Sequence, residues 1–157
     1  MKFDPLNNHR ILVIDDSADA HADFRKILIS SVLPDLLNKD EAALFGDTMI
    51  RPHFPVFEID SAYQGQDGLN RIERSLKEDR PYALAFVDIR MPPGWDGIKT
   101  ISKIWERYPD LQVVICTGFS DYSWKEIVMK LGYLDRMIVL KKPCENIEVL
   151  QLSLIHI

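Results

Sequence analysis

Short apolar runs alternate with longer amphipathic segments along this sequence, and that alternation limits the possible fold more than any other feature. Five runs have the length and composition of strands, at 10–14, 57–61, 82–88, 112–117 and 137–140. Between them, apolar residues recur at helical spacing, as in the segment from Gln64 to Asp79, where Leu69, Ile72 and Leu76 would face inward. Alternating strands and helices predict a parallel sheet with right-handed crossovers and helices on both faces.

Capping residues mark the expected ends of the helices. Ser17 and Asp96 can cap the first and third helices, and either Ser120 or Ser123 can cap the fourth, which Gly132 would end. The last helix is expected from about Glu145, and the apolar residues Ile147, Leu150 and Leu154 would face inward. The mixed polarity of 57–61 is typical of a strand at the edge of a sheet.

The segment from Leu33 to Val56 interrupts this regular order. Four breakers, Pro34, Gly46, Pro52 and Pro55, allow only one short helix, expected at 39–45. Connections in α/β units usually span only a few residues, so we interpret 33–56 as an insertion between the first helix and the second strand. It could be an arm that binds a partner or a flap that covers apolar surface, and we favour the flap. The chain as a whole, residues 1–157, is expected to form a single domain.

Composition excludes several classes of function. The net charge of -5 argues against binding to nucleic acid or to an anionic membrane, so a partner should be a protein or a small anion. No apolar run is long enough to insert in a membrane, and the amino terminus lacks the apolar core of a secretion signal, so we expect a cytoplasmic location. The cysteines and histidines show no metal-binding spacing, and no Gly-rich nucleotide fingerprint is present.

Polar residues stand at the carboxyl ends of four of the five predicted strands. They are Asp15 and Asp16, Asp88, Thr117 and Lys142. Each alone has a simple structural explanation, as a capping acid, a strand-end residue or a solvated lysine, and Lys141 competes with Lys142 for the same place. Because all strands of a parallel sheet end at the same edge, we expect the five side chains to converge in one shallow cleft.

Such a cluster has a definite chemistry. Three neighbouring carboxylates repel one another unless a cation lies between them, and Mg²⁺ prefers oxygen ligands of this kind. A metal, a carboxylate nucleophile, a hydroxyl and an ammonium group together suit phosphoryl transfer to a carboxylate. Mg²⁺ and Lys142 would neutralise phosphoryl oxygens, and Thr117 would donate a hydrogen bond to another.

The same motifs resemble the receiver domain of two-component response regulators, over nearly the whole chain. The matching features are Asp15-Asp16, the stretch 87–92 with Asp96-Gly97 behind it, Thr117-Gly118 and Lys142-Pro143. The resemblance implies a flavodoxin-like (βα)5 doubly wound sheet with strand order 2-1-3-4-5. It also implies that Asp88 accepts a phosphoryl group from the phosphohistidine of a sensor histidine kinase or phosphotransfer protein.

The resemblance assigns the other residues as well. Asp15, Asp16 and Asp88 would hold Mg²⁺ together with the backbone carbonyl of Arg90. Thr117 would be the switch hydroxyl, Lys142 would contact the phosphoryl group, and the fourth helix, fifth strand and fifth helix would carry the signal to an output domain or protein. The insertion and the loop sequences after Asp88 and Thr117 resemble receivers of larger proteins, including hybrid kinases and cyclic-di-GMP enzymes. No output domain is visible in this chain.

The sequence departs from the family pattern at two further places. The loop after Asp88 is one residue longer than in most receivers, because Pro93-Gly94-Trp95 separates Pro92 from Asp96. The position three before Lys142, where many receivers have an aromatic residue that moves with the switch, is Val139.

Two other functions remain open. One is a phosphatase of the haloacid dehalogenase type, which normally has a second acid two residues after its nucleophile, where this chain has Arg90. The other is a receiver-like interaction module that is not phosphorylated. Turnover of a small phosphoester would favour the first, and failure to take phosphate from a small donor would favour the second.

Overall fold

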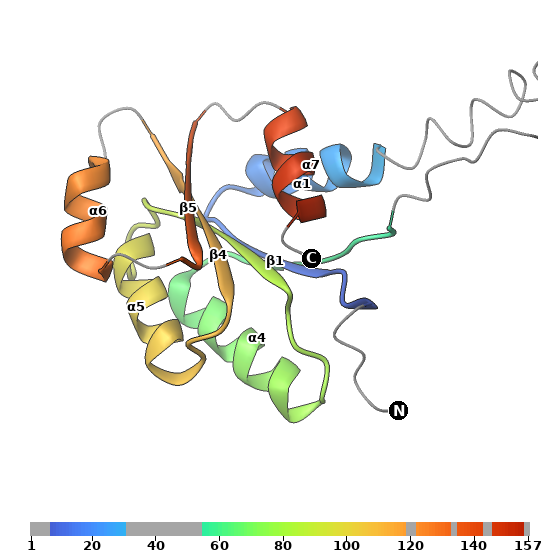
Figure 1. Ribbon diagram of the computed structural model, residues 1–157, viewed down its shortest axis with the longest axis horizontal. Coiled ribbons are helices and arrows are strands. Elements are labelled where there is room, and N and C mark those ends of the chain that lie inside the picture. Colours follow the sequence, from blue (N-terminus) through green and yellow to red (C-terminus); the bar gives the residue numbers. More distant parts are fainter. Residues whose placement is uncertain (1–6, 31–54, 119–121, 133–134, 143–145, 156–157) are drawn as a thin grey trace, which may run out of the picture.

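Five parallel strands form one sheet in the order β2-β1-β3-β4-β5, with helices on both faces (Figure 1). The computed structural model describes residues 7–30, 55–118, 122–132, 135–142 and 146–155. The strands are β1 (Arg10–Ile14), β2 (Glu58–Ala62), β3 (Leu84–Asp88), β4 (Gln112–Thr117) and β5 (Met137–Lys141). The helices are α1 (Ala18–Ser30), α4 (Gly65–Lys77), α5 (Gly97–Arg107), α6 (Trp124–Leu131) and α7 (Asn146–Ile155). The predicted flavodoxin-like fold and strand order are confirmed.

The burial of each strand follows its composition. All five residues of β3 are buried, as are residues 11–14 of β1, because these inner strands are covered by helices on both faces. In contrast, β2 lies at one edge and has an exposed residue, Glu58, and two half-buried ones, as its mixed polarity predicted.

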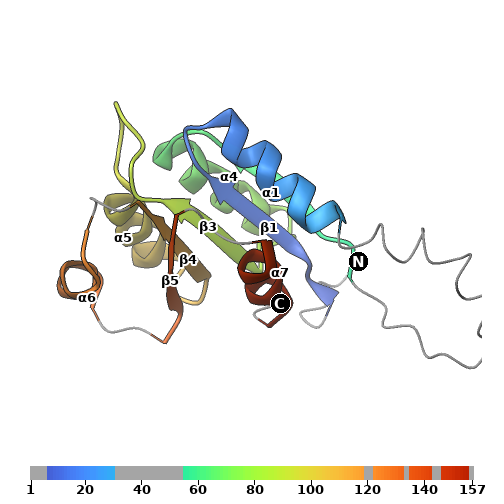
Figure 2. The same ribbon diagram turned by 90° about the horizontal axis from the view of Figure 1, so that it is seen from above.

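Two helical layers enclose the sheet. Helices α1 and α7 lie side by side on one face, and α4, α5 and α6 lie on the other (Figures 1 and 2). Successive strand residues point to opposite faces, so Ile11 and Val13 pack with Phe24 of α1, whereas Leu12 and Ile14 pack on the opposite side. The carboxyl ends of the strands lie between these two helical layers.

Most of the predicted helix ends are confirmed. The Ser17 hydroxyl accepts a hydrogen bond from the Ala20 N–H at 3.3 Å, and the Asp96 carboxylate accepts one from the Lys99 N–H at 2.8 Å. Ser123 caps α6 through a reciprocal pair of hydrogen bonds with Glu126, and Gly132 follows the helix with φ 84°. The alternative cap, Ser120, lies outside the described residues.

One predicted inward residue, Leu76, is wrong, and the predicted inward face of α7 is confirmed only in part. Leu76 is 40% exposed, because it lies in the last turn of α4, where it lines an open groove with Pro81 and Tyr82. In α7 the buried residues are Val149 and Ser153, whose hydroxyl donates to the Val149 carbonyl at 2.8 Å. Leu150 and Leu154 pack against the same core cluster, as predicted, but they are only half-buried. The side chain of Ile147 is not among those described.

Most of the predicted insertion, including its expected short helix at 39–45, lies outside the described residues. Val56, at its carboxyl end, is 74% exposed. None of the described helices has both the length and the apolar character needed to cross a membrane.

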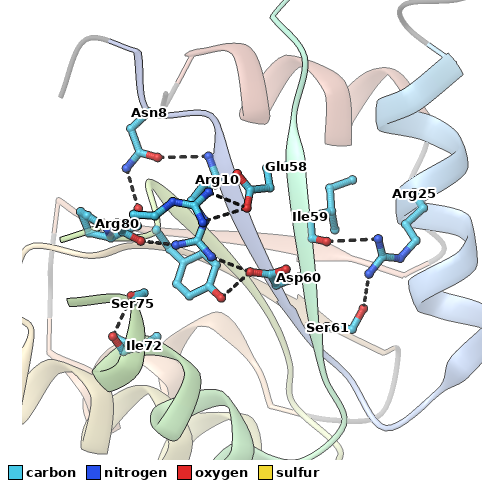
Figure 3. A network of polar contacts seen from close by, with 12 residues as sticks. Asn8, Arg10, Arg25, Glu58, Ile59, Asp60, Ser61, Ile72, Ser75 and Arg80 are labelled. Carbon is cyan, nitrogen blue, oxygen red and sulfur yellow. Dashed lines mark hydrogen bonds and ion pairs between the residues drawn. The ribbon is translucent and has the colours of Figure 1, made fainter. Parts of the chain in front are cut away.

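A polar network joins the three neighbouring strands β2, β1 and β3 on the side of the sheet where β1 and β3 begin, opposite their carboxyl ends (Figure 3). The Arg10 guanidinium donates to Asp60 Oδ2 at 2.8 Å and to the Arg80 carbonyl, and it lies 4.5 Å from the centre of the Tyr82 ring. The Tyr82 hydroxyl donates to the same Asp60 oxygen at 2.6 Å. On the outer side of β2, the Arg25 guanidinium of α1 donates to the Ile59 carbonyl at 3.1 Å (Figure 3). This hydrogen bond satisfies a backbone carbonyl of the strand at the edge of the sheet.

Candidate phosphoacceptor and metal site

Asp15 immediately follows β1 and is held by its neighbours on every side. Its backbone N–H donates to the Ala62 carbonyl at the end of β2 at 3.1 Å, and its Oδ1 accepts from the Ser17 N–H at 2.9 Å. The residue is 2% exposed. The turn between β1 and α1 therefore holds the Asp15 carboxylate in one orientation at the carboxyl edge of the sheet.

Asp88 is the last residue of β3 and is 7% exposed. The chain turns back tightly behind it, because the Gly97 N–H donates to the Ile89 carbonyl at 2.8 Å. A Cβ atom at Gly97 would lie 2.4 Å from the Asp88 carbonyl oxygen and 2.8 Å from the Ile89 Cα. Only glycine fits there, so the pair Asp96-Gly97 allows α5 to begin directly against the backbone of Asp88.

Lys142 connects the two buried acids. Its Nζ lies 3.1 Å from Asp15 Oδ2 and 3.0 Å from Asp88 Oδ1. Its backbone N–H donates to the Thr117 carbonyl at 2.8 Å, which holds the residue after β5 beside the end of β4. Lys141, the alternative considered from the sequence, is exposed as the last residue of β5.

Burial and neighbouring charges shift the pKa values of both Asp88 and Lys142. Burial raises the pKa of Asp88, and the charges of Asp15 and Asp16 raise it further, while the hydrogen bond from Lys142 acts in the opposite direction. Burial alone would lower the pKa of Lys142, but its hydrogen bond to Asp88 and the charge of Asp15 raise it above the ordinary value. The lysine therefore stays protonated, and its single charge is shared between two carboxylates.

The donor set fits a hard divalent cation. Asp15, Asp16 and Asp88 each offer a carboxylate oxygen, and these oxygens lie within 4.8 Å of one another. Asp16 is exposed and lies on the solvent side of the two buried acids. Lys142 pairs with only two of these three carboxylates, so a bound Mg²⁺ would relieve the remaining repulsion.

The other two predicted residues are less closely joined to the cluster. Thr117 is 3% exposed, and its hydroxyl donates to the adjacent Gly118 carbonyl at 3.3 Å. The Arg90 side chain is exposed, on a loop that lines an open cavity of about 540 Å³ together with Asp96 and Tyr122. That the Arg90 carbonyl binds metal stays a prediction.

Two contacts near the site had no signal in the sequence. His21 of α1 contacts the backbone of Asp15, and Tyr122 contacts Asp96. Neither residue belongs to a recognisable motif, and each contact depends on how a helix or loop packs against the ends of the strands.

Comparison with known proteins identifies the family. The family model for the response regulator receiver domain matches residues 39–153, which is more than half of the chain. The chain belongs to the receiver domain family. The matched region contains Asp88, Thr117 and Lys142, whereas Asp15 and Asp16 precede it and are placed beside Asp88 by the fold. Receiver domains are signalling modules that bind Mg²⁺ at an acidic pocket.

Curated relatives are longer proteins. This receiver is 34% identical over 134 residues to protein-glutamate methylesterase/protein-glutamine glutaminase 2 of Methanosarcina mazei, covering 85% of the chain and 28% of that protein. It is 39% identical over 66 residues to the oxygen regulatory protein NreC of Staphylococcus epidermidis, covering 42% of the chain and 29% of that protein. The chain thus spans less than a third of the length of either relative.

Solved structures show the same fold at low sequence identity. A CheY-like receiver domain from Methanospirillum hungatei superposes with a TM-score of 0.63 at 19% identity, covering 94% of this chain and 93% of that one. The CheX–CheY–BeF3–Mg²⁺ complex from Borrelia burgdorferi gives a TM-score of 0.63 at 20% identity, covering 96% and 97%. A response regulator/GGDEF domain protein gives 0.64 at 21% identity, with 96% of this chain and 50% of that chain covered.

Proposed function

We propose that this receiver accepts a phosphoryl group on Asp88, in a Mg²⁺-dependent reaction, from the phosphohistidine of a sensor histidine kinase or a phosphotransfer protein. The observation that carries the proposal is the double contact of Lys142 with Asp15 and Asp88 inside a cluster of three carboxylates. Asp15, Asp16, Asp88 and the Arg90 carbonyl would hold the metal, which supplies positive charge for the phosphoryl oxygens.

The transfer exchanges one bond to phosphorus for another. An oxygen of the Asp88 carboxylate forms a bond to phosphorus as the bond from phosphorus to the histidine nitrogen breaks, and the electron pair of that bond stays on the nitrogen. Lys142 stays protonated and attracts a phosphoryl oxygen, while the Thr117 hydroxyl donates to another. The domain would catalyse two reactions and no others. One is the transfer of the phosphoryl group from the donor to its own Asp88, and the other is the later hydrolysis of the acyl phosphate.

Intact-mass measurement after treatment with acetyl phosphate, with and without Mg²⁺, tests the proposal directly. We expect the mass of one phosphoryl group to be added only with Mg²⁺, and none in the variant Asp88→Asn. Full modification of that variant would show that another residue accepts the phosphate. Lack of modification of the unaltered protein would favour an interaction module that is not phosphorylated.

A groove of about 530 Å³ between α1 and α7 supports a protein as the phosphodonor. It is continuous with the acidic cluster, because Ser17 and Lys142 line it, and its rim carries Asp19 and Asp23. A large charged residue here should block a protein donor but not a small one. We therefore expect Ala20→Arg to slow phosphorylation by the kinase and leave modification by acetyl phosphate unchanged, with Leu76→Arg on the other face as the control.

Phosphorylation is proposed to change the surface formed by α6, β5 and α7, which would contact an output domain or protein. The Lys142 N–H is bonded to the Thr117 carbonyl, so the ends of β4 and β5 are joined next to Asp88. Beyond Thr117 the chain leads to α6, which exposes Trp124 (52%) and Met129 (77%). Hydrogen exchange should change in α6 and β5 after phosphorylation, and a response confined to residues 33–56 would make the insertion the output surface instead.

A further inference from the structure

His21 makes a specific contact with the backbone of the acidic pair. It lies in α1, is 3% exposed, and its Nε2 is 2.7 Å from the Asp15 carbonyl oxygen. A carbonyl oxygen can only accept a hydrogen bond, so Nε2 must carry the proton that is donated. The contact therefore defines the tautomer of the imidazole as well as its position.

The ring is fixed from the other side by the end of β2. The Tyr63 ring packs on it, with the ring centres 4.5 Å apart and the planes inclined by 49°. Tyr63 directly follows Ala62, whose carbonyl accepts the hydrogen bond from the Asp15 N–H. The two peptide groups of Asp15 are thus held separately, one by β2 and the other by His21.

The burial of His21 has a cost that apolar packing would avoid. Its Nδ1 is buried and has no hydrogen-bond partner among the described residues. An unpaired buried polar atom is destabilising, and a leucine could fill similar space without one. The bond at Nε2 is therefore the property that distinguishes histidine from an apolar residue at this position.

The Asp15 carbonyl matters because of the residue that follows it. It belongs to the planar peptide group that joins Asp15 to Asp16, so holding its oxygen also sets the direction of the Asp16 backbone. The Asp15 carboxylate is already held by Ser17 and Lys142. Among the described residues, no hydrogen bond or ion pair holds the exposed Asp16 carboxylate, so its place in the cluster depends on its backbone.

We infer that His21 is a positioning residue for the metal site, which directs Asp16 toward the cation by holding the Asp15 carbonyl. This inference rests on the proposed function, because it takes the three acids as the Mg²⁺ site. His21 itself donates no ligand to the metal. Replacing His21 should therefore weaken Mg²⁺ binding even in a variant that folds normally.

The test compares His21→Leu with His21→Gln. Leucine fills the space without a donor, whereas glutamine can place an amide N–H where histidine places Nε2–H. We expect the leucine variant to bind Mg²⁺ about tenfold more weakly, and the glutamine variant to recover most of that loss. Mg²⁺ affinity is measured by calorimetric titration, and urea unfolding in metal-free buffer gives the stability of each variant separately. Equal Mg²⁺ affinity in all three proteins, or a glutamine variant as weak as the leucine variant, would overturn the inference.

A measurement on the unaltered protein covers the case in which a variant does not fold. A nitrogen-15 spectrum of the metal-free protein should show His21 protonated at Nε2, with a scalar coupling across the hydrogen bond to the Asp15 carbonyl carbon. Protonation at Nδ1 alone would overturn the inference, because Nε2 could not then donate. If the unaltered protein bound no Mg²⁺ at all, the proposed metal site would be wrong, and this inference with it. Tight Mg²⁺ binding that does not change in His21→Leu would reject the inference alone.

Discussion

The Tyr122 hydroxyl donates to Asp96 Oδ2 at 3.1 Å and thereby joins the loop after β4 to the loop after β3. The other oxygen of the same carboxylate accepts the Lys99 N–H and caps α5. The Lys130 ammonium of α6 lies 5.0 Å from the centre of the Tyr122 ring. One carboxylate therefore links the start of α5 to the segment that leads into α6, on the side of the site where Thr117 is located.

Tyr122→Phe should loosen this link with little loss of stability. Removing a single, partly buried hydrogen bond is expected to cost about 1 kcal/mol of unfolding free energy. Hydrogen exchange should become faster at residues 122–126 in the unphosphorylated protein, because the loop loses its attachment to Asp96. Tyr108→Phe, at the opposite edge of the sheet, is the matched control. Unchanged exchange in the Tyr122 variant would show that the hydrogen bond does not restrain the loop.

Gly97→Ala should disturb the site through the backbone of Asp88. The added Cβ would lie 2.4 Å from the Asp88 carbonyl oxygen, so the chain has to shift, and we expect a loss of about 1 to 3 kcal/mol in urea unfolding. Gly94→Ala is the control, because its Cβ would meet only the end of the Gln64 side chain, at 2.7 Å, which can move aside. Equal stability of the two variants would contradict the role assigned to Gly97.

Mg²⁺ should stabilise the protein, and less so as the pH falls. At one hundred times its dissociation constant a ligand adds about 2.7 kcal/mol to the unfolding free energy. Burial and the neighbouring acids raise the pKa of Asp88, so protons compete with the metal at a higher pH than for an ordinary aspartate. Thermal unfolding is measured at pH 7.5 and pH 5.0, with and without one fixed Mg²⁺ concentration. The rise in melting temperature caused by Mg²⁺ should be smaller at pH 5.0.

The same raised pKa predicts the behaviour of the metal-free protein. A group whose pKa is higher in the folded state contributes stability at low pH, and loses that contribution as the pH rises through the folded pKa. The ionised form of Asp88 is therefore unfavourable in the metal-free fold at neutral pH. Asp88→Asn should be at least as stable as the unaltered protein in urea at pH 7.5 without metal, and a clear destabilisation would contradict this electrostatic account.

Asp60→Asn should test the polar network at the opposite edge of the sheet. Burial would raise the pKa of Asp60, but the hydrogen bonds from Tyr82 and Arg10 outweigh it and hold the pKa below the ordinary value. A lowered pKa contributes stability that is present above the unfolded-state value, about 3.9, and is lost as the pH falls toward the folded-state value. We expect a loss of about 1 to 2 kcal/mol at pH 7 that becomes smaller below pH 4.

Glu58→Gln is the control for that experiment. Its ion pairs with Arg10 and Arg80 involve a side chain that is 48% exposed, so the loss in urea unfolding should be below about 1 kcal/mol. Equal losses in the two variants, at every pH, would show that the contacts with Tyr82 and Arg10 add nothing specific to Asp60.

The sequence alone determined the sheet and the convergence of the acids. A run such as 84–88, apolar up to its final acid, is typical of a strand covered on both faces, and parallel strands place their carboxyl ends at one edge. The sequence therefore predicts that Asp15, Asp88 and Lys142 lie together. The cap Asp96 was equally predictable, and Ser123 was one of two candidates for its helix, because each accepts a hydrogen bond from an N–H group three residues away.

The tertiary structure alone decided which groups hold those acids in place. In α7 the most deeply buried residues are Val149 and Ser153, whereas the predicted leucines Leu150 and Leu154 contact the core and stay half-buried. His21 and Tyr122 contact Asp15 and Asp96 because a helix and a loop pack beside particular strand ends. Sequence periodicity records which residues avoid water, but hydrogen bonds between separate elements depend on distances and orientations that only packing sets.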